Sequence, residues 1–340
     1  MHKKLIALAV AGLVAAPAMA QSNVTIYGLV DVGVSYRGDN IAPGVGSKFS
    51  VDSGIQSGNR LGFKGTEDLG NGLKVGFVLE TGFGIEQPEF RNGSAFGRQA
   101  FVTLSGGFGT LAVGRVYTPQ FNLLSSVDPF GLFGTVGQMS NLYKTDVRVD
   151  NTVAYISPSF SGLTVTAAYV NNLSGAETAG NDNDTRVFAL SPVYKNGPIL
   201  LGLNYHKIDP QAAGRPSQDV WDLAGSYDFG VAKVAAAYGY REVNATDERN
   251  SWMLGVTVPV SGAGRVLASY NYTKLDGTSV DPKSTQWAIG YVHDLSKRTN
   301  LYVAYADISN KKGANASVGD ASNGGAGYQS GFNIGIRHKF

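Results

Sequence analysis

Residues 23–36 read NVTIYGLVDVGVSY, a stretch in which apolar and polar side chains alternate. Val24, Ile26 and Val30 share one parity, whereas Thr25 and Asp31 share the other. Side chains of successive residues in a strand point to opposite faces of the sheet. The alternation therefore predicts a β-strand with one apolar face and one polar face.

The same alternation recurs to the C-terminus, and apolar residues at helical spacing are not detected. Segments of nine to eleven residues have the length of a tilted strand crossing a bilayer. The pattern predicts about sixteen strands, near residues 23–36, 58–67, 72–83, 95–104, 109–117, 148–156, 162–170, 185–194, 198–207, 219–228, 231–241, 251–260, 264–273, 284–294, 299–308 and 329–340.

The connections between these segments alternate between short and long. Short ones cover 68–71, 105–108, 195–197, 229–230 and 261–263, and long polar ones cover 37–57, 84–94, 118–147, 171–184, 208–218, 242–250, 274–283 and 309–328. An even number of strands with short turns at one end and long loops at the other is typical of outer-membrane barrels. A closed barrel also pairs every backbone group in lipid without a free edge. We therefore expect an all-β fold, a 16-stranded antiparallel transmembrane β-barrel.

The N-terminus and the composition narrow the class further. Lys3 and Lys4 precede an apolar stretch of twelve residues, which predicts a signal peptide over 1–20, cleaved between Ala20 and Gln21, and one barrel domain over 21–340. The 340 residues include 45 glycines and no cysteine, which excludes disulfide scaffolds and thiol chemistry. Lys and Arg number 28 against 26 Asp and Glu, with no basic cluster, so nucleic acid is not an expected partner.

Several short motifs follow one another along the chain, and their order is more informative than any one of them alone. They are VTIYGLVD at 24–31, NRLGFKGTEDLG at 59–70, LETGF at 79–83, RQAFV at 98–102, GGFGTLAVGR at 106–115 and a last strand that ends in Phe340. In these motifs the chain resembles the general diffusion porins of Gram-negative bacteria. The resemblance implies a homotrimer in the outer membrane, in contact with its lipid and lipopolysaccharide. It also implies that the barrel-assembly machinery recognises Phe340, and that the third long loop folds inward.

That third loop, 118–147, contains several large apolar residues and is not expected to extend into solvent. The resemblance implies that it narrows the pore and places Asp128 on an acidic side, facing a basic ladder of Arg60, Arg98 and Arg148. Strand parity independently sends Arg60 and Arg148 inward, but it leaves Arg98 undecided.

Four further charges are expected in the lumen. Glu80 shares inward parity with Lys74, and the resemblance implies that it is an acidic residue of the constriction that holds an arginine of the ladder in place. Lys64 and Asp31 are also predicted to face the lumen. The first strand lacks the basic residue that family members can carry there, which argues against a strong preference for anions.

Together these features predict a passive channel for small hydrophilic solutes and ions, without a cofactor or metal, in which opposed charges give at most mild selectivity. His206, His293 and His338 lie in no catalytic pattern, so an enzyme is not expected. A channel specific for sugars or organic anions remains the alternative. It would need a run of lumen aromatics, which the strands do not provide, although Tyr27 and Tyr302 have inward parity. A barrel whose loops carry an enzymatic or adhesive function is a further possibility.

Overall fold

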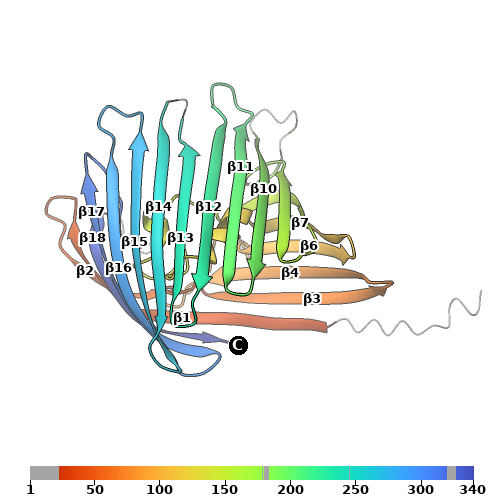
Figure 1. Ribbon diagram of the computed structural model, residues 1–340, viewed down its shortest axis with the longest axis horizontal. Coiled ribbons are helices and arrows are strands. Elements are labelled where there is room, and N and C mark those ends of the chain that lie inside the picture. The colour runs from red at the N-terminus through yellow and green to blue at the C-terminus, as the bar shows by residue number, and fades with distance from the viewer. Residues whose placement is uncertain (1–22, 178, 180–183, 245, 320–326) are drawn as a thin grey trace, which may run out of the picture.

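The computed structural model describes residues 23–177, 179, 184–244, 246–319 and 327–340 (Figure 1). The predicted signal peptide and its cleavage site at Ala20 and Gln21 lie outside these ranges. The strands are β1 (Asn23–Asn40), β2 (Lys48–Ser53), β3 (Arg60–Gly70), β4 (Leu73–Phe83), β5 (Phe90–Arg91), β6 (Gln99–Gly106), β7 (Gly109–Tyr117), β8 (Arg148–Ile156), β9 (Leu163–Val170), β10 (Thr185–Asn196), β11 (Ile199–Pro210), β12 (Gln218–Asp228), β13 (Lys233–Glu242), β14 (Glu248–Pro259), β15 (Gly264–Asp276), β16 (Lys283–Asp294), β17 (Thr299–Lys311) and β18 (Tyr328–Lys339).

Sixteen of these strands form a closed antiparallel barrel, and β2 and β5 are short additions within the second and fourth positions of the wall. The predicted fold class is therefore confirmed. In Figure 1, the loops that join β11 to β12 and β13 to β14 lie at the top, whereas the turn from β10 to β11 and the C-terminus lie at the bottom. The part of the chain that the structure describes contains no helix that is long and apolar enough to cross a membrane.

The barrel closes between the two ends of the chain. One edge of β1 pairs with β18, and its other edge pairs with β3 and then with β2. The terminal residue takes part, because Phe340 donates its N–H to the carbonyl of Gly28 at 3.1 Å and accepts the N–H of Gly28 at 3.0 Å. The Phe340 ring occupies the space in which a side chain at position 28 would lie, so a larger residue there would displace this ring.

The two faces of the wall differ in polarity as the alternation predicts. Large apolar side chains such as Leu201, Leu254 and Ile289 are about half exposed on the outside. Inward-facing Asn204 and Gln286 are completely buried beneath other protein groups. Paired aromatic rings stand on neighbouring strands, with ring centroids 4.2 to 5.3 Å apart: Tyr205 with Trp221, Tyr238 with Trp252, and Trp287 with Tyr305. This inverted arrangement is expected for a barrel surrounded by lipid.

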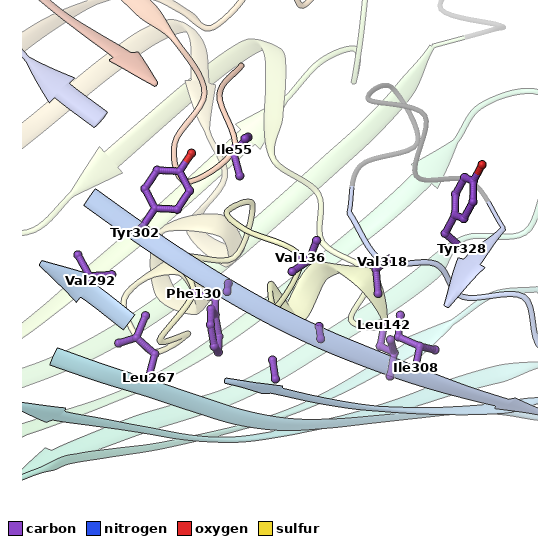
Figure 2. Close-up of a cluster of buried hydrophobic side chains, with 13 residues drawn as sticks. Ile55, Phe130, Val136, Leu142, Leu267, Val292, Tyr302, Ile308, Val318 and Tyr328 are labelled. Carbon is purple, nitrogen blue, oxygen red and sulfur yellow. The ribbon is translucent and has the colours of Figure 1, made fainter. Parts of the chain in front are cut away.

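Loop 118–147 lies inside the barrel and contains two short helical segments, α2 (Pro119–Ser125) and η1 (Met139–Asn141). The helices were not expected from the sequence; α2 begins where the Thr118 side chain accepts the N–H of Phe121, with Pro119 at the first helical position. Figure 2 shows Phe130 and Val136 of the loop among Leu267 and other side chains of the wall. The inward folding of the third long loop is thus confirmed.

Glycines on the inner face of the wall make room for this loop. A Cβ atom at Gly239 would lie 2.1 Å from the Tyr143 hydroxyl, and one at Gly290 would lie 2.8 Å from the Phe130 ring. Three further inward glycines are covered in the same way by loop side chains: Gly202, Gly255 and Gly331. Part of the high glycine content therefore reflects close packing of the loop against the strands.

Candidate pore constriction

A large cavity with a volume of about 1100 Å³ lies between loop 118–147 and the wall from β2 to β8. Its charged lining contains more basic than acidic side chains. The basic side chains are Lys48, Arg60, Arg91, Arg98 and Arg148, and the acidic ones are Asp52, Glu86 and Glu89. All three arginines of the predicted ladder therefore line one cavity.

Arg98 is the most tightly held of the three. Its Nε donates to Glu80 Oε1 at 2.8 Å, and its Nη2 donates to the Tyr117 hydroxyl at 2.6 Å. The second oxygen of Glu80 accepts the hydroxyl of Tyr27 at 3.0 Å. Glu80 is 2% exposed and Arg98 6% exposed. Glu80 thus has the position beside an arginine that was expected from the sequence.

Arg60 and Arg148 are bound only by neutral oxygen atoms. Arg60 Nε donates to the Gly58 carbonyl at 3.0 Å, while Arg148 donates to the Tyr117 hydroxyl at 3.2 Å and to Asn92 Oδ1 at 3.4 Å. Within the described ranges, neither guanidinium forms an ion pair with a carboxylate. Both arginines therefore line the cavity without a direct carboxylate partner among the described residues.

The acidic residues of the lining, in contrast, are each paired with arginine. Asp52 bonds Arg37 at 2.8 Å, whereas Glu86 and Glu89 both contact Arg91. Glu86 and Glu89 belong to the connection between β4 and β6, so the acidic groups near the ladder come from the second long loop and from β2.

The position of Asp128 differs from the expectation. Its side chain is 6% exposed and is absent from the lining of the large cavity. One carboxylate oxygen accepts the N–H of Phe130, and the other accepts those of Leu132 and Met139, at 2.8 to 3.0 Å. Burial raises the pKa of Asp128 to about 6, and these three donors counteract part of that rise. The Asp128 carboxyl group therefore binds backbone N–H groups of the loop, and the acidic side chains that line the large cavity are Asp52, Glu86 and Glu89.

Asp31 also stabilises the fold, by binding a segment that lines the cavity. Its carboxylate accepts the N–H groups of Gln56 and Ser57 at 2.7 and 2.6 Å and the hydroxyl of Tyr302 at 2.6 Å. These bonds hold residues 54–59, which leave the wall between β2 and β3 and contribute to the cavity lining. Asp31 points inward as predicted, but it is fully buried beneath this segment.

Lys64 and Lys74 lie on the same wall, away from the constriction. Both line a separate cavity of about 570 Å³. Lys64 Nζ is 5.3 Å from the centroid of the Tyr27 ring, and Tyr27 in turn donates to Glu80. The two lysines line this second cavity together with Asp68, nearer the end with the short turns than the ladder is.

The edge of loop 118–147 that borders the cavity is aromatic, which sequence reasoning missed. Phe121 and Phe133 line the cavity next to Tyr117. Tyr117 and Phe121 are stacked with their centroids 4.4 Å apart, and Phe133 follows at 6.2 Å from Phe121. The one signal in the sequence was the number of phenylalanines in the loop, because strand parity does not apply outside strands.

Polar contacts fasten both ends of the loop to the wall. Asp222 of β12 accepts hydrogen bonds from Gln120 and Tyr143 of the loop, and from Asn204 of β11. Asp146, near the end of the loop, contacts both His206 and Arg241. The loop, and with it the aromatic edge, is consequently fixed at a defined position in the lumen.

Comparisons with known proteins identify a family model and several relatives that match this chain. A family model described as Gram-negative porin matches residues 7–313. The chain is 36% identical to outer membrane porin protein 32 of Delftia acidovorans and 33% identical to an outer membrane porin protein of Bordetella pertussis; each alignment covers 100% of both chains.

Solved structures give the same fold. The chain is similar to an anion-selective porin from Comamonas acidovorans, with a TM-score of 0.77 and 32% identity, over 94% of this chain and 100% of that one. The trimer form of OmpT from Vibrio cholerae, with a TM-score of 0.71 and 16% identity over 94% and 99% of the two chains, shares the fold.

Proposed function

Because the chain belongs to the family of Gram-negative porins and is a β-barrel protein of the outer membrane, we propose that it forms a water-filled channel with a preference for small anions. Solutes would move down their own gradients, without a catalytic step. Sixteen strands enclose a lumen too wide for wall side chains to fill, so the inward loop determines what passes.

The observation that carries the proposed preference is the imbalance of charge in the constriction. Every carboxylate of the lining is paired with an arginine, whereas Arg60 and Arg148 bond only to neutral atoms. A narrow, charged passage concentrates ions of the opposite sign and repels those of the same sign. The similar barrel from Comamonas acidovorans is an anion-selective porin, which agrees with this direction.

In this proposal Arg60, Arg98 and Arg148 form the basic side, Glu80 orients Arg98, and Lys64 and Lys74 extend the positive potential along the wall. Glu86 and Glu89 supply the acidic groups that were first expected from Asp128. The lining retains a positive balance, so we propose a clearer anion preference than the sequence alone suggested.

The purified protein in a planar bilayer tests this function. We expect discrete conductance steps and, in a tenfold gradient of KCl, a reversal potential of the sign that chloride selectivity produces. Absence of steps would overturn the channel function, and a potential of the opposite sign would overturn the charge argument alone.

We also propose the associations that the family resemblance implies. The chain would lose residues 1–20 on export, with Gln21 as the new N-terminus, and Phe340 would mark it for the barrel-assembly machinery. It would then form a homotrimer in contact with outer-membrane lipid and lipopolysaccharide. Mass measurement of the protein extracted in mild detergent tests the removal of residues 1–20 and the homotrimer. A mature monomer would contradict the trimer.

A further inference from the structure

The aromatic edge of loop 118–147 adjoins the basic ladder directly. Tyr117 joins the two, because its hydroxyl accepts hydrogen bonds from Arg98 and Arg148 while its ring stacks on Phe121. The guanidinium carbon of Arg148 is 4.8 Å from the centroid of the Tyr117 ring. One continuous surface therefore presents positive charge at one end and aromatic rings at the other.

Phe133 remains at the cavity although the residue before it is completely buried. Gly131 and Leu132 both have left-handed backbone conformations, with φ of 82° and 58°. Such a conformation is unfavourable for leucine. It directs Leu132 into complete burial, whereas Phe133 stays 37% exposed and lines the cavity. The turn that buries Leu132 thus leaves the next side chain, the large apolar ring of Phe133, in contact with the lumen.

An aromatic ring at this position can make a favourable contact with a solute that water cannot make. Aromatic rings gain from offset or edge-to-face contact beyond the burial of their area, and a guanidinium binds a carboxylate with two parallel hydrogen bonds. Arg60 and Arg148 have no carboxylate partner among the described residues. The aromatic and guanidinium groups together match a solute that combines a carboxylate with an aromatic ring.

We propose that the constriction contains a weak subsite for aromatic carboxylates, in which Arg60 and Arg148 attract the carboxylate and Phe121 and Phe133 contact the ring. This proposal rests on the proposed channel function and gives it a preferred class of solute. Sugars would also stack on aromatic rings, but they carry no charge that the unpaired guanidinium groups could neutralise. Aliphatic anions lack the ring.

The test compares three blockers of the chloride current through single channels in KCl. Benzoate has both features, cyclohexanecarboxylate has the same charge and a ring that is not aromatic, and benzyl alcohol has the aromatic ring without the charge. We expect the half-blocking concentration of benzoate to be about three- to tenfold lower than that of cyclohexanecarboxylate. Benzyl alcohol should block less than either. Equal block by the two carboxylates would overturn the subsite.

A variant identifies the rings involved. In Phe121→Leu/Phe133→Leu, which keeps apolar bulk, the half-blocking concentration of benzoate should rise to that of cyclohexanecarboxylate. The matched control is Phe160→Leu, because Phe160 is exposed in the turn between β8 and β9 and does not line the cavity; it should retain the discrimination. Retained discrimination in the double variant would contradict the assignment to these rings.

The unmodified protein separates the two proposals. Chloride selectivity in a KCl gradient without discrimination between the carboxylates would refute the subsite and leave the channel function intact. Absence of conductance steps would refute the channel function itself.

Discussion

Arg98 Nε lies 2.8 Å from Glu80 Oε1, and both side chains are less than a tenth exposed. The same carboxylate binds Tyr27, and the same guanidinium binds Tyr117. Four inward side chains, from β1, β4, β7 and the residue just before β6, are therefore connected in one row on the wall of the constriction. This row fixes the geometry of the ladder and also reduces its charge by one.

Glu80→Gln should increase the anion preference and reduce stability. The amide cannot neutralise Arg98, so the constriction gains one positive charge, and loss of one partner of a buried ion pair costs roughly 3–5 kcal/mol. Reversal potentials in a KCl gradient and unfolding in denaturant measure the two effects. Glu67→Gln removes an exposed carboxylate outside the cavity and is the control. An unchanged reversal potential would argue against any role of Glu80 in the balance of charge.

Neutralisation of the whole ladder should reverse the selectivity. With Arg60, Arg98 and Arg148 changed to glutamine, two basic side chains of the lining remain against three acidic ones. A unit charge at 4 Å contributes about 1 kcal/mol in water, which corresponds to roughly a fivefold change in permeability ratio for each charge. The reversal potential should move toward that of potassium. Arg298→Gln, in an exposed turn, should leave it unaltered; a triple variant that behaved like this control would refute the ladder.

Asp128→Asn should act on the loop and leave the sign of the selectivity unchanged. In the variant, the amide nitrogen would face backbone N–H donors, which should lower the free energy of unfolding by about 1–3 kcal/mol. The pKa of about 6 exceeds that of an unfolded aspartate. The folded state consequently binds more protons between pH 4 and 6, and the stability of the unmodified protein falls as pH rises through this window. The melting temperature of Asp128→Asn relative to the unmodified protein should therefore rise from pH 4 to 6 and then level off. A constant difference would contradict this account of Asp128.

Gly239→Ala should loosen the constriction. Alanine normally stabilises a strand relative to glycine, but here its methyl group would displace the Tyr143 hydroxyl and break its 2.9 Å bond to Asp222. We expect the free energy of unfolding to fall by about 1–3 kcal/mol and the single-channel currents to become noisier. Gly262→Ala adds the same methyl group in open space in a turn. Similar currents from the two variants would show that Tyr143 does not restrain the loop.

Strand parity explains which parts of the constriction could be predicted. Arg60 and Arg148 begin regular strands, so the phase of their apolar neighbours determines their direction. Arg98 precedes the first residue of β6, and its direction could be inferred only from the family resemblance. Asp128 lies in a loop, where backbone N–H groups compete for its carboxylate, and no periodicity describes that competition.

Residues 37–57 illustrate a second limit. The sequence predicts a long loop there, but β2 pairs with β1 through Lys48–Ser53, and residues 54–59 turn inward. The inward turn depends on Asp31 and Tyr302, which is 271 residues away along the chain. Local patterns do not contain a contact of this range. The aromatic edge was hidden for a related reason, since the exposure of Phe133 results from the left-handed conformation of its two predecessors.

The pairing of Gly28 with Phe340 has a consequence for the order in which the barrel forms. Almost the entire chain separates these residues, so their contact carries the largest loop-closure entropy of the fold. Neighbouring strands can pair as hairpins beforehand, but until β1 and β18 pair with each other, each leaves one edge of the sheet open. The seam between β1 and β18 therefore forms at a higher entropic cost than any pairing of neighbouring strands, and disruption of this seam would expose two sheet edges to other strands.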